Sequence, residues 1–458
     1  MSQQSTVSKR RQSLQGYIQK VIQHIHANPT THRSATLRAL LECLAEFSNQ
    51  QINFFEDLYD GPHASHLREI HPAEYVLNTT LQQVGFDLDV IVRAYSQRAM
   101  NLGDPNQDDG SQVYLKLADY WTYWALKPVM KWGDSGQSEQ PLVDESTVMT
   151  YFQKSTNVRL IPYAPAVLIG IPFSAIDNSF DLLAIPHEVG HYIYHNGTWQ
   201  GQCVEAWLQQ QLQASGLPEW AEHWAEECFA DVYGCLIAGK HIADSALEMA
   251  RNASFSEYFE DDGEHPIPAL RPGIYLAVLE KLSGLDWETI EEFRAAWEVL
   301  RRERPNQSLF KPVVVAASGT ARIIIAAEEI EAALRQIVDT IFALPPLRRL
   351  AQCRSRSTQG LWAYSLQEME GAALDWSVEG SLPELTSNGE HLAISTDQAP
   401  ITIRPIGTTP HDQLRTQLTT ELEKHSSQPV PSDAVKCAFN HAIDFRGWTV
   451  KGPIGRTH

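Results

Sequence analysis

The sequence predicts a mainly helical protein of the α+β class, in which a small sheet accompanies a larger set of helices. Three observations support this prediction. Apolar residues recur at helical spacing in several long segments. The segment 157–173 is apolar, β-branched and interrupted by prolines, which favours a strand over a helix. The region 380–435 is rich in Ser, Thr, Pro and Gly and contains only short strand-like runs.

The composition is that of a globular, acidic chain. Of its 458 residues 43% are apolar, which allows two or three domains with substantial cores. The formal net charge of −20 leaves no basic face for phosphate contacts, so we expect no nucleic-acid partner. No apolar run follows the basic N-terminus, and no window approaches a membrane span in length. We therefore expect no secretory signal, no membrane span, a cytoplasmic location and free cysteine thiols.

The first domain is predicted to be helical. Residues 35–47, 87–100 and 117–133 each carry apolar side chains at helical spacing. A polar stretch at 132–146 then marks a boundary. We expect residues 1–135 to form a helical N-terminal domain, which is a candidate surface for a protein partner.

The second domain is expected over residues 136–345. In its strand segment, Pro162 and Pro165 predict an edge strand, because a central strand needs the amide hydrogens that proline lacks. The following apolar segments predict helices at 185–197, 218–239, 272–282, 287–303 and 322–342. Residues 346–458 are expected to form a C-terminal region of mixed or partly irregular structure.

The segment IPHEVGHYIYHNG, at residues 185–197, carries the most specific chemical pattern. On a helix, positions i and i+4 lie on one side, so His187 and His191 can offer two imidazole nitrogens to one metal ion. Zinc accepts such ligands in a tetrahedral arrangement. Glu188 is rotated off that face and can act as general base on a water at the metal. Pro186 requires the helix to begin near this residue or to kink there.

A catalytic zinc ion also needs a third protein ligand and one position that is left for water. The helix predicted at 218–239 offers Glu227 and Asp231, which are four residues apart and therefore share a face. Glu227 is the candidate third ligand, and Asp231 can accept the second N–H of a ligating histidine. Glu226 is the rival ligand, but it lies about 100° around the helix from Glu227 and has no acid four residues later.

These spaced motifs resemble those of the gluzincin metallopeptidases. In that group H-E-x-x-H is followed by E-x-x-x-D, and the form E-x-x-A-D at 227–231 is similar to the CAAX-prenyl-endopeptidase and heat-shock-protease branch. His265-Pro266 with Arg271 also resembles the H-P-x-x-x-x-R segment of that branch. The resemblance covers residues 157–285. Many members of the branch have transmembrane helices, whereas we expect none in this chain.

The resemblance implies a zincin-like core, with a small sheet and active-site helices, that binds one catalytic Zn²⁺ ion. It assigns zinc binding to His187, His191 and Glu227, the general base to Glu188, and the orientation of a ligand histidine to Asp231. His265 and Arg271 would stabilise the oxyanion that forms when an amide carbonyl is attacked. The strand VLIGIP at 167–172 would bind extended peptide by strand addition.

We therefore predict a soluble zinc-dependent endopeptidase that acts on peptide or protein substrates through a metal-activated water. The alternative is a non-catalytic or degenerate metallopeptidase-like protein that binds or regulates a partner and holds a structural zinc ion. A structural site has four protein ligands, and His195, one further turn along the helix, is the candidate fourth. Glu188 favours the enzyme, because a structural site does not need it. From composition alone, residues 384–458 are hypothesised to form a lid or an autoinhibitory tail.

Overall fold

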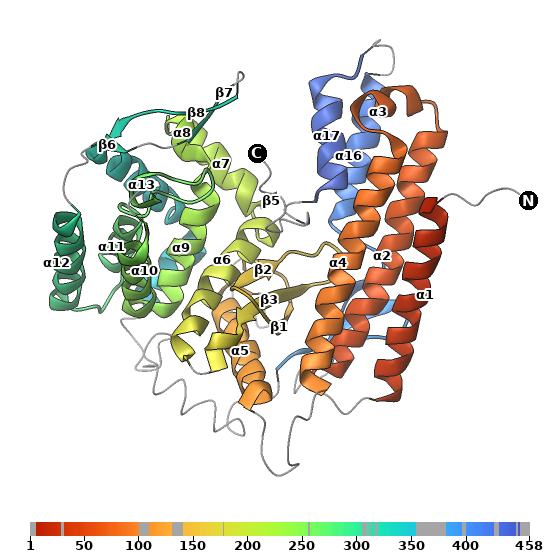
Figure 1. The fold of residues 1–458 in the computed structure, drawn as a ribbon, viewed down its shortest axis with the longest axis horizontal. Helices are drawn as coiled ribbons and strands as arrows, with labels where there is room; N and C mark the ends of the chain where they lie inside the picture. The colour runs from red at the N-terminus through yellow and green to blue at the C-terminus, as the bar shows by residue number, and fades with distance from the viewer. Residues whose placement is uncertain are drawn as a thin grey trace, which may run out of the picture.

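A bundle of long helices forms the N-terminal part of the computed structural model. The described residues are 6–28, 32–99, 110–130, 141–176, 178–254, 257–304, 309–310, 313–316, 319–353, 382–395, 400–425, 430–445 and 448. The first helices are α1 (Thr6–Ala27), α2 (Ser34–Asp60), α3 (Ala64–Ile70), α4 (Ala73–Ala99) and α5 (Gly110–Leu126). Helices α1, α2 and α4 lie side by side (Figure 1). The helices predicted at 35–47 and 87–100 are confirmed within α2 and α4.

The spacing of apolar residues explains why α2 forms and which face it buries. Leu37, Leu40, Leu44 and Phe47 recur every three or four residues, and all four are fully buried in one core cluster. The same cluster contains Val84, which lies on α4. Burial of these side chains therefore joins α2 to α4.

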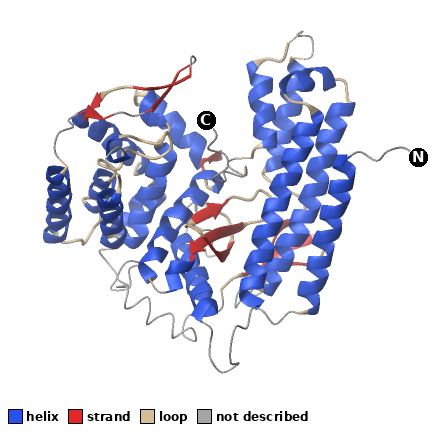
Figure 2. Ribbon diagram, viewed as in Figure 1, coloured by secondary structure: helices blue, strands red, loops and turns tan. Residues whose placement is uncertain are grey.

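A three-stranded sheet lies between this bundle and the helices of the candidate site (Figure 2). Its strands are β1 (Thr147–Gln153), β2 (Asn157–Arg159) and β3 (Ala166–Pro172), in the order β1-β3-β2. Strand β3 pairs with β1 in parallel and with β2 antiparallel. The segment 157–173, predicted as one edge strand, contains two strands: β2 is an edge, but β3, which includes 167–172, is central, so the prediction is wrong for 167–172. Pro165 precedes β3 and Pro172 ends it, so neither proline interrupts its hydrogen-bond ladder.

The two faces of the sheet pack into different cores. Val167, Ile169 and Ile171 belong to the cluster that contains α5 and the helices of the candidate site, whereas Ala166 and Leu168 belong to the cluster with α2 and α4. Successive side chains of a strand point to opposite faces. A strand that is buried on both faces is apolar throughout, which explains the continuous apolar run of β3.

Side chains, rather than another strand, close the outer edge of β1. The Thr150 N–H donates to Asp119, and Arg98 donates to the Thr150 carbonyl, each at 2.7 Å. Gln97 accepts from the Phe152 N–H at 2.7 Å and donates to its carbonyl at 2.9 Å. Polar groups from α4 and α5 therefore satisfy this edge and attach the sheet to both helices.

The middle of the chain supplies the helices of the candidate site. They are α6 (Ile185–Asn196), α7 (Val204–Ala214), α8 (Glu219–Glu222), α9 (Ala225–Ala238), α10 (Lys240–Asn252), α11 (Pro272–Leu279), α12 (Trp287–Glu303), α13 (Ala327–Ile341) and α14 (Pro345–Cys353). The single helix predicted at 218–239 is thus divided into α8 and α9. Short 3-10 helices are η1 (Lys127–Val129) after α5, η2 (Phe173–Ile176) and η3 (Ser179–Ala184) between β3 and α6, and η4 (Glu257–Phe259) between α10 and α11.

Short hairpin strands accompany these helices. They are β4 (Thr198–Trp199), β5 (Gln202–Cys203), β6 (Leu309–Phe310), β7 (Val313–Ala316), β8 (Gly319–Arg322) and β9 (Ile325–Ala326). Because β8 and β9 occupy 319–326, the helix predicted at 322–342 begins only at Ala327. The prediction of a mainly helical fold with small sheets is confirmed.

The C-terminal region packs against the N-terminal helices. It contains β10 (Glu384–Ser387), β11 (His391–Ser395), β12 (Ile401–Pro405), α16 (His411–Lys424) and α17 (Asp433–Ile443). Leu385 and Ile394 share a core with α2, and Phe439 packs against Phe55 and Tyr59 of that helix. This placement gives no support to the lid hypothesis, because no described residue beyond 382 lines the cavity at the candidate site.

Two sequence-based expectations concern covalent chemistry and the membrane. In the described parts of the chain, no helix combines the length and the apolar character that a bilayer crossing requires. Five of the six cysteines are free in the structure: Cys43, Cys203, Cys228, Cys235 and Cys437.

Candidate metal centre

The close crossing of α6 and α9 builds the centre. A Cβ atom on Gly190 would lie 2.6 Å from the Cα atom of Ala230, so glycine permits an approach that a side chain would block. Helix α6 begins at Ile185, which places Pro186 in the first turn, where a missing N–H costs no helical hydrogen bond. Of the two alternatives for Pro186, the helix start is therefore the one observed.

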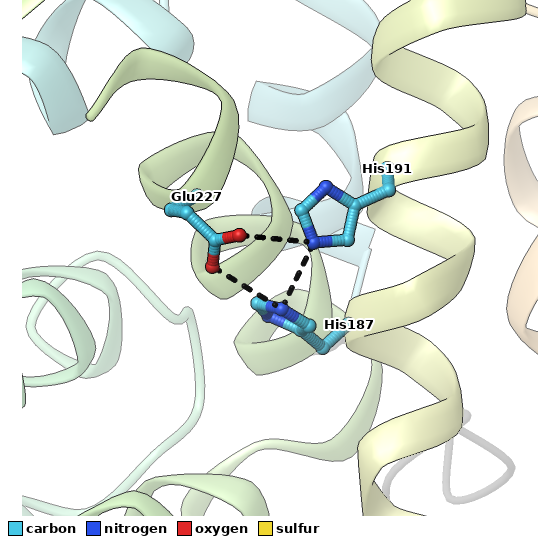
Figure 3. Close-up of side chains that lie close together, drawn as sticks. All are labelled: His187, His191 and Glu227. Atoms are coloured by element: carbon cyan, nitrogen blue, oxygen red, sulfur yellow. Dashed lines mark hydrogen bonds and ion pairs between the residues drawn. The ribbon is translucent and has the colours of Figure 1, made fainter. Parts of the chain in front are cut away.

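Three ligand atoms converge at this crossing (Figure 3). His187 Nε2 lies 3.1 Å from His191 Nε2 and 3.5 Å from Glu227 Oε2, and His191 Nε2 lies 3.5 Å from Glu227 Oε1. Ligand atoms that surround a tetrahedral zinc ion at its usual bond lengths lie about 3.3 Å apart. Each of these separations is close to that value, so the two imidazoles and the Glu227 carboxylate could together hold one metal ion.

Each histidine also turns its second ring nitrogen toward a carboxylate. His187 Nδ1 lies 3.0 Å from Asp231 Oδ1, and His191 Nδ1 lies 3.0 Å from Glu226 Oε1. This arrangement fixes the ring planes and leaves both Nε2 atoms for a metal. The position predicted for Asp231 beside a ligand histidine is observed. Glu226 lies behind His191 and not among the converging ligand atoms, so it does not compete with Glu227.

The electrostatics of the centre favour a cation. Burial alone would lower the pKa of His191, but the hydrogen bond with Glu226 and the charges of Glu227 and Glu188 outweigh burial and raise this pKa to about 9. Burial likewise opposes ionisation of Asp231, yet Arg271 and His187 hold its pKa below the ordinary value. The surrounding carboxylates thus stabilise positive charge at the point where the imidazoles meet.

Asp231 is held firmly by two groups at the start of α11. Arg271 donates to it through Nε at 2.7 Å and through Nη2 at 2.8 Å, and the Tyr275 hydroxyl donates to it at 2.6 Å. The Arg271 Nη2 also lies 3.2 Å from Glu227 Oε2. Sequence reasoning missed Tyr275, although its position four residues after Arg271 at the start of a helix was a usable signal.

Glu188 lies at the junction of α6 and the sheet. Its Oε2 accepts the backbone N–H of Val158 at 2.7 Å, and Val158 is the middle residue of β2. The Val158 N–H therefore points toward α6, which carries Glu188, and away from the neighbouring strand β3. The carboxylate is thereby fixed, and no pattern in the sequence indicated this contact with Val158.

A cavity of about 630 Å³ opens at the centre. His187, Glu188, His265 and Arg271 line it together with mainly apolar side chains of η3 and α10. His265 Nε2 lies 3.3 Å from Glu227 Oε1, and its Nδ1 lies 2.9 Å from Asp262. Both residues predicted to act on an oxyanion therefore reach the cavity.

His195 does not complete a fourth ligand position. Its Nε2 lies 2.9 Å from Glu226 Oε1, and its Nδ1 lies 3.4 Å from Glu205. Among the described residues, the converging group contains only His187, His191 and Glu227. The geometry therefore lacks the four-ligand arrangement that the structural-zinc alternative requires.

Comparison with known proteins adds no further assignment. No protein-family model, no curated protein and no solved structure matches the chain. The resemblance to the gluzincins therefore rests on the sequence motifs alone.

Proposed function

We propose that the protein is a zinc-dependent endopeptidase with a zincin-like core. The observation that carries this proposal is the convergence of His187, His191 and Glu227 next to a cavity that His187 and Glu188 line. Two histidines and one glutamate form a ligand set that is typical of catalytic zinc, with a position left for water or substrate. When bound, zinc would polarise the scissile carbonyl and make water acidic enough to attack near neutral pH.

The residues of the chain have distinct tasks in this proposal. Glu188 would accept the proton of the attacking water and pass it to the leaving amine. The Val158 N–H holds this carboxylate in position until substrate enters. His265 would donate to the developing oxyanion, because its ring faces the cavity and Asp262 supports its other nitrogen. Arg271 would also position Asp231, since its Nε and Nη2 both donate to that carboxylate.

We assign peptide binding by strand addition to β2 rather than to β3. Strand β3 is hydrogen-bonded on both sides and cannot accept another strand. Strand β2 is the edge next to Glu188, so we place an extended substrate along it. Such a peptide would lie beside the cavity with its carbonyl near the ligand atoms.

Glu188→Gln separates metal binding from chemistry. We expect this variant to retain one zinc ion per chain and to lose peptide hydrolysis by a factor on the order of 10² to 10⁴, the usual contribution of a general base. Zinc content would be measured by atomic absorption, and hydrolysis with a fluorogenic peptide library. Glu222→Gln is the control, because Glu222 is a half-buried acid that does not line the cavity. Absence of stoichiometric zinc in the wild type, or unchanged cleavage by Glu188→Gln, would refute the proposal.

A further inference from the structure

A chain of side chains, joined by hydrogen bonds and one ion-pair contact, extends from His191 away from the centre. Glu226 Oε1 faces His191 Nδ1 at 3.0 Å and His195 Nε2 at 2.9 Å, so one oxygen is shared by two imidazoles. The other ring nitrogen of His195 lies 3.4 Å from Glu205 Oε2. The order is therefore His191, Glu226, His195 and Glu205, across α6, α9 and α7.

Glu226 needs such support more than Asp231 does. The Asp231 side chain is fully buried, whereas that of Glu226 is 36% exposed. An exposed carboxylate has rotamers that reach water, and each of them would release His191 Nδ1. His195 is only 8% exposed and its ring packs edge-on against Tyr194, so it is a fixed donor for Glu226.

The two ligand histidines are supported in parallel ways. His187 contacts Asp231, which Arg271 and Tyr275 hold. His191 contacts Glu226, whose other protein partner is His195. In each case a carboxylate orients the histidine that would bind the metal, and further hydrogen-bond donors orient that carboxylate.

We propose that His195 and Glu205 are positioning residues for the metal ion. They hold Glu226 Oε1 on His191 Nδ1 and thereby fix the plane and tautomer of the His191 ring. This inference rests on the metal site of the proposed function and extends it to two residues that do not reach the ligand position. It assigns a task to His195, which the motif H-E-x-x-H leaves unexplained.

Zinc affinity of the purified full-length protein tests this inference without any peptide substrate. The metal-free protein would be titrated with zinc in competition with a chromophoric chelator. Loss of an outer partner of a ligand histidine lowers metal affinity about 10- to 100-fold, which is the loss expected for Glu226→Gln. We expect His195→Phe to lower the affinity about 10-fold, since Glu226 is still present but is no longer held on His191 Nδ1. We expect a smaller loss for Glu205→Gln, which acts only through His195.

Two further variants separate positioning from general damage. His195→Gln should restore most of the affinity, because its amide can donate to Glu226 from the position of Nε2. His425→Gln is the matched control, because it removes another histidine 3.4 Å from a glutamate, at the C-cap of α16 and outside the centre, and should leave zinc affinity unchanged. Circular dichroism of the metal-free proteins reports whether each variant folds.

The outcomes distinguish this inference from the proposed function. If Glu226→Gln loses affinity while His195→Phe and Glu205→Gln bind zinc as tightly as the wild type, the inference is wrong and the metal centre stands. If His195→Phe fails to fold, Glu205→Gln carries the test, since its side chain is 28% exposed, and unchanged affinity overturns the inference. If the wild type binds no zinc, both are wrong.

Discussion

Gly190→Ala tests whether the close crossing of α6 and α9 creates the metal centre. The new Cβ atom would lie 2.6 Å from Ala230 Cα, 3.1 Å from Ala230 O and 3.2 Å from Ala230 Cβ. Favourable carbon–carbon contacts need about 3.5–4.0 Å. Two of these three atoms belong to the backbone, so no side chain can swing aside and the helices must separate by about 1 Å.

That separation is large compared with the tolerance of a metal site. Glu227 is three residues before Ala230 on α9, whereas His187 and His191 flank Gly190 on α6. Ligand distances are held to about 0.2 Å, so a shift of about 1 Å takes Glu227 away from the histidines. We expect zinc affinity to fall about 100-fold or more, since even loss of an outer partner costs 10- to 100-fold.

The free energy of unfolding of the metal-free Gly190→Ala protein should change less than its free energy of zinc binding. Overpacking costs about 1–3 kcal/mol, while replacing a helical glycine by alanine recovers about 0.8–1 kcal/mol. Urea unfolding and chelator competition would measure the two effects separately. Gly85→Ala in α4 is the control, because its Cβ would meet nothing within 4 Å and only the helix gain remains. If Gly190→Ala binds zinc like the wild type and is stabilised like Gly85→Ala, the crossing does not set the ligand geometry.

Three further predictions concern stability. Burial, with the nearby Arg415 charge, lowers the pKa of His411 to about 3 in the folded protein. In the unfolded chain a histidine titrates near 6.5. The stability that the neutral His411 contributes is therefore complete above about pH 6.5 and is lost as the pH falls toward 3, by up to about 1.4 kcal/mol per pH unit. His411→Phe should flatten the urea-derived stability in that window, and an unchanged slope would contradict the assignment. Asp119→Asn removes the buried partner of Arg98, which lies 2.7 Å away, and should lower the free energy of unfolding by about 3–5 kcal/mol. The exposed pair Arg93–Asp89 provides the control, since Asp89→Asn should lower it by less than about 1 kcal/mol. Trp448→Phe removes the donor to Asp87 Oδ2 at 2.7 Å and should lower the free energy of unfolding by about 1–3 kcal/mol, whereas no change would show that water replaces the indole.

The parts of the centre that depend on helix geometry could be predicted from the sequence. His187 and His191 are four residues apart, as are Glu227 and Asp231, so their shared faces follow from the helical repeat. The convergence of both histidines with Glu227 is observed. Glu226 was harder to interpret, because its contact with His191 depends on how α9 crosses α6. The glycine in H-E-V-G-H controls that crossing, and its importance becomes visible only with Ala230 opposite.

The order of strands could not be predicted in the same way. Prolines around 157–173 indicated an edge strand, since sequence alone does not show whether a proline lies inside a strand or at its end. The structure places Pro165 before β3 and Pro172 at its last position. The run from Val167 to Ile171 is apolar because two cores cover it, one on each face. Strand pairing depends on residues far apart in sequence, which no local pattern specifies.

The terminal regions, which share no motif with the gluzincins, contribute to the candidate centre through β2. This strand has three residues and is too short to keep its place by pairing alone. Its Arg159 donates to the buried Asp87 of α4 at 2.6 Å, and Trp448 donates to the other oxygen of Asp87. Val158, the preceding residue, holds Glu188. The N-terminal helices and the C-terminal Trp448 therefore fix the strand that positions the proposed general base. The core that the sheet shares with α2 and α4 thus contributes to the candidate centre.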